Sequence, residues 1–328
     1  MIISRTPFRI SFFGGGTDFP GYFTQHGGSV ISVTIDKYCY LSVHHLTKFF
    51  KHNYRASYSR TESVMKPEEF EHPLIRESLL YAGIREGVEI SHVADLPGQT
   101  GLGSSSAFTV GLMNSLCAFI KKRITPEWLA RAAIEIERNR VKDAGGWQDQ
   151  YAAAYGGFNR INFQTDREVT VQTVGIAPEA LFELEASLML FYLGSECSAE
   201  NILREQISRT GENFDRLSRM RQIVDHAEDI LQNGKHLDEF GKLLHETWLQ
   251  KKELSSGISN PVIDEAYDAA RGAGAIGGKL LGAGGRGFLC LYAPTAKHAA
   301  VREKLKDLKE VSFRFSEEGS QIIFNSDE

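Results

Sequence analysis

The stretch Pro97–Ala107 combines glycines and serines in a pattern typical of a site that binds a phosphate group. Gly98, Gly101 and Gly103 are followed by three serines and then by an apolar segment that predicts a buried helix. Glycine adopts positive φ without steric cost, and the free N–H groups at the start of a helix bind anions. A serine-capped helix after a flexible turn is the simpler alternative, but the stretch is richer in glycine and serine than a turn requires. It lacks the lysine of a Walker A loop.

A second glycine stretch, Gly14–Gly16, has a cation before it and an anion after it. Arg9 and Asp18 stand on its two sides, and aromatic residues flank the glycines. Three consecutive glycines allow the backbone to pass close to a small molecule. A glycine hairpin would also fit, but the delivery of an arginine and an aspartate to one turn favours a functional role.

Two acids and a third glycine stretch complete the candidate residues. Asp149 falls in the first turn of an alanine-rich helix closed by Gly156 and Gly157, where an acid is most often a helix cap. Glu137 lies on the preceding helix, and its position alone indicates a surface glutamate. The stretch Gly277–Gly287 runs into an apolar strand, and alone it resembles any glycine hairpin.

Alternating and helical spacings predict the elements that position these residues. Strands before Gly14 and over 88–94 are expected to lead into the first two glycine stretches, and Thr125, Pro126 and Glu127 mark a helix start. Further strands are expected over 28–43, with a turn near Asp36 and Lys37, over 158–185, at 187–193 and as a hairpin around 317–319. Helices are expected over 68–87, 199–232, 236–254, 260–271 and 295–308, with Ile202, Leu203, Ile207 and Leu217 in their core.

The composition is that of an ordinary globular protein. Of 328 residues, 42% are hydrophobic and 24% are charged, and the net charge of −5 gives no general attraction to nucleic acid or to an anionic membrane. There is no signal segment and no apolar run of membrane-spanning length, so we expect a cytoplasmic protein without nucleic-acid or membrane partners. Scattered cysteines without a C-x-x-C pair favour buried thiols over disulfides or zinc; they are Cys39, Cys117, Cys197 and Cys290.

The three glycine stretches together resemble the three ordered motifs of the GHMP kinases, the superfamily of galactokinase, homoserine kinase, mevalonate kinase and phosphomevalonate kinase. The second motif of that family wraps the ATP phosphates without a Walker lysine, as Pro97–Ala107 would. Gly282–Gly287 matches the third motif, and in this register the segment around Asp149 matches the catalytic segment. The first motif has the form Pro-x-Arg-[apolar]-x-x-x-Gly-x-x-x-Asp, supplied here by Pro7, Arg9, Ile10, Gly14 and Asp18.

The resemblance implies an α+β fold of two domains with the active site in the cleft between them. Residues 1–183 would form an N-terminal, ribosomal-protein-S5-like α/β domain that binds ATP. Residues 184–328 would form a C-terminal, ferredoxin-like α+β domain. The activity implied is phosphoryl transfer from ATP, with Mg²⁺, to a hydroxyl group of a sugar.

The resemblance also implies a role for each candidate residue. Asp149 would handle the proton of the acceptor hydroxyl, and Arg9 would balance charge beside it. Mg²⁺ would be bound by Ser106 and Glu137. The ATP phosphates would be held by Pro97, Gly98, Gly101, Leu102, Gly103, Ser104, Ser105 and Ser106. The acceptor would face Gly14, Gly15, Gly16, Thr17, Asp18, Gly284 and Gly285.

The acceptor itself is narrowed by the first motif. Galactokinases carry Gly-Glu-His-Thr-Asp where this chain has Gly14–Asp18 with glycines in place of Glu and His, which counts against galactose. The opening residues look most like bacterial D-glycero-D-manno-heptose 7-phosphate kinases. That likeness implies anomeric phosphorylation to the 1,7-bisphosphate, on the way to a GDP-activated heptose for surface polysaccharide. Fucokinase-type domains are the alternative.

Some features stay open at this stage. The segment Gly194–Ser198, which carries a basic residue in relatives, has none here, and neither Lys279 nor Arg286 can be assigned to the substrate. A GHMP-fold regulator that binds its ligand without catalysis is disfavoured by the intact Asp149 and Glu137. A dinucleotide-binding oxidoreductase would need a Gly-x-Gly-x-x-Gly turn followed by an acid about 20 residues later, which the sequence lacks. A homodimer also stays open.

Overall fold

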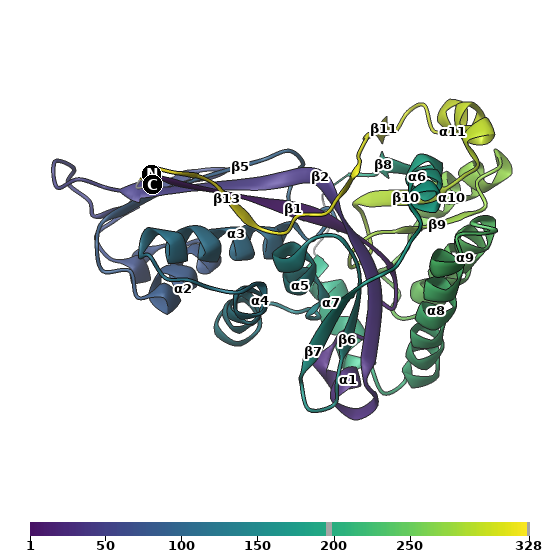
Figure 1. The fold of residues 1–328 in the computed structure, drawn as a ribbon, viewed down its shortest axis with the longest axis horizontal. Coiled ribbons are helices and arrows are strands. Elements are labelled where there is room, and N and C mark those ends of the chain that lie inside the picture. The colour runs from purple at the N-terminus through teal and green to yellow at the C-terminus, as the bar shows by residue number, and fades with distance from the viewer. Residues whose placement is uncertain (195–198, 327–328) are drawn as a thin grey trace.

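The computed structural model describes residues 1–194 and 199–326, which form two β-sheets with helices packed against them (Figure 1). Within the described residues the larger sheet has nine strands and the smaller sheet has four. Helices gather beside each sheet rather than alternating with strands along the chain. The α+β class predicted from the sequence is therefore confirmed.

The nine-stranded sheet is built around one long strand, β2. It pairs antiparallel with β1, β5, β6 and β12, because its 18 residues offer hydrogen-bonding partners along both edges. The strands of this sheet are β1 (Ile2–Phe13), β2 (Gly28–His45), β3 (Tyr54–Ser57), β4 (Thr61–Val64), β5 (Val88–Ala94), β6 (Phe158–Phe163), β7 (Val169–Thr173), β12 (Phe315–Ser316) and β13 (Gln321–Asn325).

Helices α2 to α5 lie together on one face of this sheet (Figure 1). Most of α3 is buried, as its apolar sequence predicts, and α4 starts where expected, with Thr125 Oγ1 accepting a hydrogen bond from Trp128 N at 3.2 Å. The helices of this half are α1 (Pro20–His26), the 3₁₀ turn η1 (Pro67–Glu69), α2 (Pro73–Ala82), α3 (Ser104–Phe119), α4 (Pro126–Ile134), the π-helix η2 (Glu135–Arg140) and α5 (Gln148–Tyr155).

The four-stranded sheet has the order β11-β8-β10-β9, and all its pairs are antiparallel. Its strands are β8 (Leu188–Tyr192), β9 (Gly277–Leu280), β10 (Phe288–Tyr292) and β11 (Lys309–Glu310). The helices of this half are α6 (Pro178–Ser187), α7 (Ala199–Ser208), α8 (Phe214–Asn233), α9 (Asp238–Lys252), α10 (Pro261–Gly272), the 3₁₀ turn η3 (Thr295–Lys297) and α11 (His298–Lys304).

Three expected strand features are wrong. Residues 178–187 form helix α6, because Pro178 occupies the first helical position and Glu179 lies in the first turn. Asp36 and Lys37 form a bulge rather than a turn, since the pairing of β2 with β1 skips from Ile35 to Tyr38. The last segment is not a hairpin, because β12 pairs with β2 and β13 pairs with β1.

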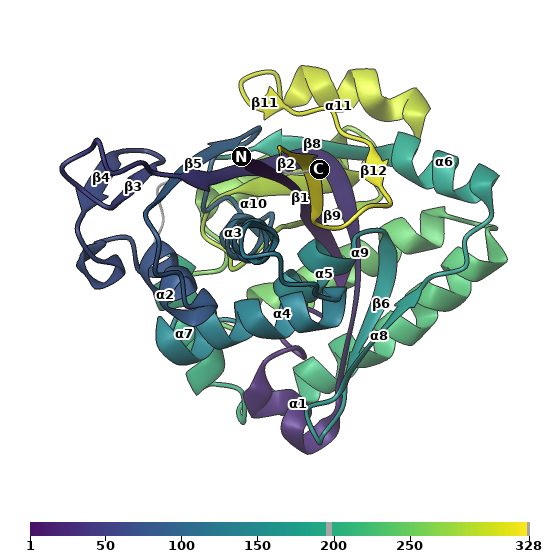
Figure 2. The ribbon, with the colours of Figure 1, turned by 60° about the vertical axis from the view of Figure 1, so that its left-hand side comes forward.

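The last strands therefore return to the first sheet. Figure 1 shows the two ends of the chain close together where β13 lies beside β1, and Figure 2 shows the same ends from another side. A division at residue 183 falls inside helix α6 and leaves residues 315–325 in the sheet of the first half. The boundary itself stays a prediction.

Aromatic rings join the two halves of the core. Phe240 of α9 packs edge-on against Phe12 and Phe13 at the end of β1, with ring centroids 5.2 and 4.9 Å apart. All three rings are fully buried, so the end of β1 that leads into the first glycine stretch is fixed against the second half.

Burial of the predicted core residues is mixed. Ile202 and Leu217 are buried as expected. Leu203 instead lines a cleft and Ile207 is exposed, so the expectation is wrong for Leu203 and Ile207.

Buried free thiols are confirmed for Cys39, Cys117 and Cys290, and Cys197 lies outside the described residues. Of the helices in the described ranges, none combines the length and the apolar character needed to span a bilayer.

Candidate active site

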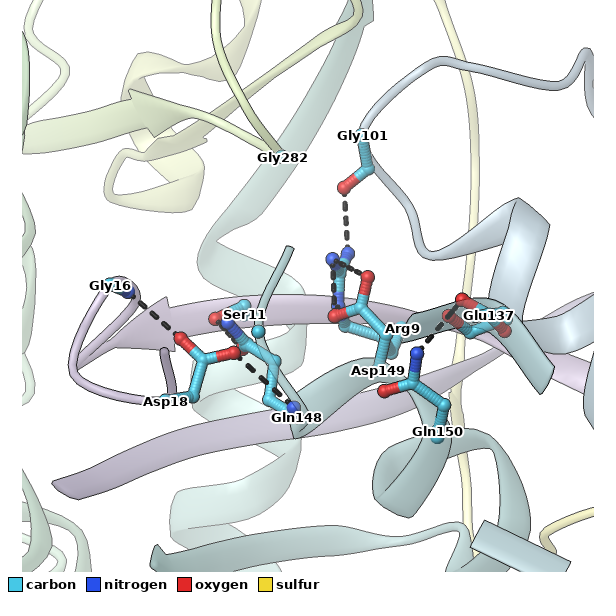
Figure 3. Close-up of polar contacts among 12 residues, drawn as sticks. Arg9, Ser11, Gly16, Asp18, Gly101, Glu137, Gln148, Asp149, Gln150 and Gly282 are labelled. Carbon is cyan, nitrogen blue, oxygen red and sulfur yellow. Dashed lines mark hydrogen bonds and ion pairs between the residues drawn. The ribbon is translucent and has the colours of Figure 1, made fainter. Parts of the chain in front are cut away.

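An ion pair between Arg9 and Asp149 forms the centre of the candidate site (Figure 3). Arg9 Nε and Nη2 donate to the two carboxylate oxygens of Asp149 at 2.9 Å each, and Arg9 Nη1 donates to the carbonyl oxygen of Gly101 at 2.6 Å. Such a bidentate pair fixes both side chains in one geometry. Arg9 is only 4% exposed, so the structure brings a buried cation, an acid and the second glycine stretch together, as predicted.

Asp18 lies beside this pair at the start of helix α5. Its carboxylate accepts hydrogen bonds from the backbone N–H of Gly16 at 2.9 Å and of Gln148 at 3.2 Å, and the Gln148 side chain accepts one from Ser11 Oγ at 2.6 Å. Burial, and secondly the charge of Asp149, raise the pKa of Asp18. Each carboxylate oxygen of Asp18 therefore has a backbone donor, and the raised pKa favours the protonated form.

The glycines of the first stretch divide into structural and cleft-lining positions. A Cβ on Gly14 would lie 1.9 Å from Ser29 O, and the buried Thr17 hydroxyl donates to Gly14 O, so these two residues shape the turn. Gly15 and Gly16 instead line a cleft together with Asp18. This cleft, called the acceptor cleft after the ligand that the sequence predicts there, is lined by Arg9, Ser11, Gly15, Gly16, Asp18, Phe19, Arg138, Ala144, Gly145, Gly146, Gln148, Asp149, Leu203, Gln206, Lys251, Leu254, Lys279, Gly282 and Ala283.

The Pro97–Ser106 loop connects β5 to α3 and is packed against the third glycine stretch. Gly101 has φ +85°, and a Cβ on it would lie 2.3 Å from Leu281 O, which only glycine avoids. Gly103, with φ +75°, precedes the first residue of α3, so the loop ends at a helix N-terminus, as predicted. Pro97 and Gly98 are exposed, Leu102 is fully buried, and Ser104 Oγ accepts from Gln99 N at 3.1 Å.

Ser106, Glu137 and Gln150 form a buried polar group behind this loop. Glu137 Oε2 accepts hydrogen bonds from Ser106 Oγ at 3.0 Å and from Gln150 Nε2 at 2.8 Å. Burial raises the pKa of Glu137, and its other oxygen, Oε1, has no partner. Figure 3 shows Glu137 and Gln150 on one side of the Arg9–Asp149 pair, with Asp18 on the other side.

The π-helix η2 carries Glu137 into this position. Its wide turn is closed by a hydrogen bond from Val141 N to Ile136 O, five residues back, at 2.9 Å. Widened turns of this kind are common at functional sites. Here the turn leaves Glu137 only 1% exposed, so the surface alternative that the sequence left open is wrong.

The third glycine stretch reaches the cleft at a different point from the one expected. Gly284 and Gly285 are buried against Ile258, and Gly285 N donates to Ile258 O at 2.9 Å. Gly282 and Ala283 line the acceptor cleft in their place, and Arg286 is exposed. The substrate role expected for Gly284 and Gly285 stays a prediction.

Two lysines of the cleft were not predicted as site residues. Lys279 of β9 is 3% exposed and Lys251 of α9 is 7% exposed, and both line the acceptor cleft. A signal for Lys251 was available, because it continues the spacing of Phe240, Leu244 and Trp248 along the buried face of α9. Lysine is almost never fully buried unless its ammonium group is paired, so a lysine on the buried face of a helix indicates a specific partner.

A second cavity, of about 540 Å³, adjoins the Pro97–Ser106 loop. Phe108 stacks on His72 with centroids 5.2 Å apart and meets His92 edge-on at 5.0 Å, and Tyr58 packs against His72 at 4.8 Å. Burial lowers the pKa of His72 and of His92. This aromatic cavity is also lined by Gly98, Gln99, Ser104 and Ser105 of the loop.

Relatives of known activity match nearly the whole chain. Residues 72–157 match the family model described as GHMP kinases N terminal domain, and residues 227–310 match GHMP kinases C terminal. The D-glycero-alpha-D-manno-heptose 7-phosphate kinase of Campylobacter jejuni is 30% identical over 97% of this chain and 97% of its own length. The L-fucokinase/L-fucose-1-P guanylyltransferase of Bacteroides fragilis is 29% identical over 92% of this chain, which covers 35% of that longer protein.

Solved structures share the fold. A D-glycero-D-manno-heptose 1-phosphate kinase from Bacteroides thetaiotaomicron superposes with a TM-score of 0.81 at 24% identity and covers 99% of both chains. A Lactococcus lactis galactokinase complexed with galactose gives a TM-score of 0.77 at 15% identity, with 98% of this chain and 94% of that chain covered. At these identities the likeness concerns the fold alone.

Proposed function

This chain belongs to the GHMP kinase family and is a sugar phosphotransferase, and we propose that its acceptor is the anomeric hydroxyl of D-glycero-D-manno-heptose 7-phosphate. The product would be the 1,7-bisphosphate, a precursor of a GDP-activated heptose for surface polysaccharide. The proposal is supported by the Campylobacter jejuni relative, whose name gives the same substrate and whose length the chain covers almost completely. It is also supported by the glycines at positions 15 and 16, which open the acceptor cleft.

We propose that ATP binds along the Pro97–Ser106 loop with its base in the aromatic cavity. The rings of Phe108, His72 and His92 offer flat apolar faces that suit a purine. The loop then leads to the N-terminus of α3, where N–H groups and the helix dipole would hold the phosphates.

The residues around Glu137 fit a bound Mg²⁺. Ser106 and Glu137 supply hard oxygen ligands. Glu137 Oε1 accepts no hydrogen bond from the described residues, so it is free to bind a cation. A cation would also offset the cost of burying this carboxylate. Mg²⁺ in kinases is usually held by one or two carboxylates together with substrate phosphates and water. When bound, it would neutralise charge on the ATP phosphates.

The Arg9–Asp149 pair is the observation that carries the mechanism. Asp149 would accept the proton of the acceptor hydroxyl as that oxygen attacks the γ-phosphorus, because the bidentate contact leaves each of its oxygens a further lone pair. Arg9 holds this carboxylate in place and, through Gly101 O, fixes it relative to the phosphate-binding loop. Catalysis would thus come mainly from positioning and charge stabilisation.

Phosphorus NMR tests the proposal directly. The purified protein is incubated with Mg·ATP and, separately, D-glycero-D-manno-heptose 7-phosphate, fucose, galactose and mannose. A new anomeric phosphate resonance with the heptose, lost in Asp149→Asn, supports both substrate and mechanism. Turnover of fucose instead would show the fucokinase alternative to be correct. ATP binding without any transfer would favour a binding protein of the same fold.

A further inference from the structure

The acceptor cleft contains more cations than its carboxylates can balance. Its charged lining residues are four cations, Arg9, Arg138, Lys251 and Lys279, against the two carboxylates of Asp18 and Asp149. Arg9 is paired with Asp149, and Arg138 lies 3.5 Å from Glu137 behind the cleft. Of these four cations, Lys251 and Lys279 are the two without a carboxylate partner among the residues that the structure describes.

Both lysine ammonium groups are buried and are bonded only to backbone carbonyl oxygens. Lys251 Nζ donates to Leu280 O at 2.9 Å and to Gly282 O at 2.5 Å. Lys279 Nζ donates to Phe12 O at 2.9 Å, which fixes it at the end of β1. Carbonyl oxygens orient an ammonium group but do not neutralise it, so both charges are buried at a cost that an anion would remove.

The two lysines act on each other electrostatically. Burial lowers the pKa of both groups, and the charge of Lys279 lowers that of Lys251 further. Lysine is almost never fully buried unless it is paired, and groups with shifted pKa values cluster at functional sites, so two such lysines in one cleft indicate an anionic ligand that would favour their charged forms. A phosphate monoester, with a charge of about −1.5 to −2 near neutral pH, matches the surplus.

We propose that Lys251 and Lys279 form the site for the phosphate group that the acceptor sugar already carries. The inference rests on the proposed function, which it extends by naming the residues that select a phosphorylated sugar over an unphosphorylated one. Lys251 comes from α9 and Lys279 from β9, so the second half of the molecule supplies this site.

The other phosphate that could meet these lysines is the γ-phosphate of ATP. The lining of the two cavities argues for the acceptor instead. The loop residues Gly98, Ser104 and Ser105 line the aromatic cavity, whereas the lysines line the cleft that also contains Gly15, Gly16 and Asp18. The lysines therefore lie on the acceptor side of the site.

Steady-state kinetics with two acceptors test the proposal. Lys251→Met and Lys279→Met remove the charge and keep an apolar side chain of similar length. Lys252→Met is the matched control, because Lys252 is the next residue on α9 but pairs with Asp264 at 3.1 Å outside the cleft. Thermal unfolding of each variant shows whether it is folded.

The measured quantity is the ratio of kcat/KM for D-glycero-D-manno-heptose 7-phosphate to that for the unphosphorylated heptose. Charge-assisted hydrogen bonds are lost in Lys251→Met and in Lys279→Met, so this ratio should fall by roughly 10- to 100-fold in each and stay constant in Lys252→Met. An equal loss with both acceptors would overturn the proposal, because it would place the lysines on the transferred phosphoryl group or in the fold.

Calorimetry separates this proposal from the proposed function. If the parent protein transfers phosphate to no sugar, the proposed function fails, and binding of heptose 7-phosphate without ATP becomes the test of the lysines. Weaker binding by Lys251→Met than by the parent and by Lys252→Met would support the site. Binding unchanged by Lys251→Met, or absent in the parent, would overturn it.

Discussion

The Pro97–Ser106 loop lines the aromatic cavity and meets the acceptor cleft through Arg9, and these two regions are built from opposite kinds of contact. The cleft is held together by charged and polar pairs that are distant in the chain. Arg9 and Asp149 are 140 residues apart, and Ser11 and Gln148 are 137 residues apart. In the cavity, Tyr58, His72, His92 and Phe108 meet through ring faces and edges.

The difference between the two regions lies in how narrowly their contacts fix distances and angles. Hydrogen bonds and ion pairs have narrow distance and angle requirements, so the cleft fixes reacting groups closely. Ring packing tolerates small displacements, which would suit the nucleotide base that we propose for the cavity. Changes in the cleft should therefore affect transfer strongly, and changes in the cavity should affect ATP affinity mildly.

The largest effect is expected from Asp149→Asn. The amide keeps the shape of the side chain but cannot take a proton, so kcat should fall on the order of 10²- to 10⁴-fold, while the KM for ATP changes little. Quenched-flow or coupled assays at saturating substrates measure this, with Asp268→Asn on the exposed face of α10 as the control. A loss under tenfold would mean that another group accepts the proton.

Glu137→Gln should produce the next largest effect. The Mg²⁺ concentration for half-maximal activity is expected to rise by roughly 10- to 100-fold, because the amide removes the ligand charge. Burial raises the pKa of Glu137 in the folded state, so the charged form costs stability at neutral pH, and the neutral amide should unfold at the same temperature or higher. A variant that unfolds early with an unchanged Mg²⁺ requirement would show that Glu137 has only a structural role.

The binding of a phosphorylated acceptor should depend on pH through Lys279. Burial and the charge of Arg9 lower its pKa to about 7, with Asp18 and Cys290 acting in the opposite direction, and Lys251 is shifted the same way. The protonated lysine binds phosphate, so the affinity should fall by up to about tenfold per pH unit as the pH rises above about 7.

Values of KM between about pH 6.5 and 8.5 check this expectation. Lys279→Met should flatten the profile for heptose 7-phosphate. If the pH dependence of KM were the same for the unphosphorylated heptose, it would not come from binding of the 7-phosphate, and a group other than Lys279 would be titrating.

The smallest effect is expected in the aromatic cavity. Phe108→Leu removes the ring that contacts His72 and His92, so the KM for ATP should rise about 3- to 10-fold, with the loss falling on ATP rather than on the acceptor. Phe119→Leu, at the other end of α3, is the control. A fall in kcat as large as that of Asp149→Asn would end the distinction between the two regions.

The glycine stretches and the acids beside them could be predicted from the sequence because their chemistry is local. Gly103 is a glycine because its φ of +75° turns the chain into the next helix, and Ser106 and Asp149 stand at helix starts. Lys251 could not be assigned in this way. Its role depends on Leu280 and Gly282, about 30 residues away, whose carbonyl oxygens bind the ammonium group only in the folded chain.

The fold was predictable where elements are long and periodic. The helices over 214–233 and 238–252 show helical spacing, whereas β12 has two residues and carries no period to detect. The pairing of β12 and β13 with the first sheet depends on contacts between the two ends of the sequence, which no local pattern contains.

The π-helix at Glu135–Arg140 makes the length of this helix, and not only its residue types, part of the proposed metal site. A π-turn accommodates one residue more than the α-helical turn it replaces. Deleting Glu135 would let the helix become regular, but Glu137 would then turn by about 100° relative to α4, and its carboxylate would no longer meet Ser106. An engineer who straightened this helix to gain stability would thereby displace the carboxylate proposed to bind Mg²⁺ without substituting it.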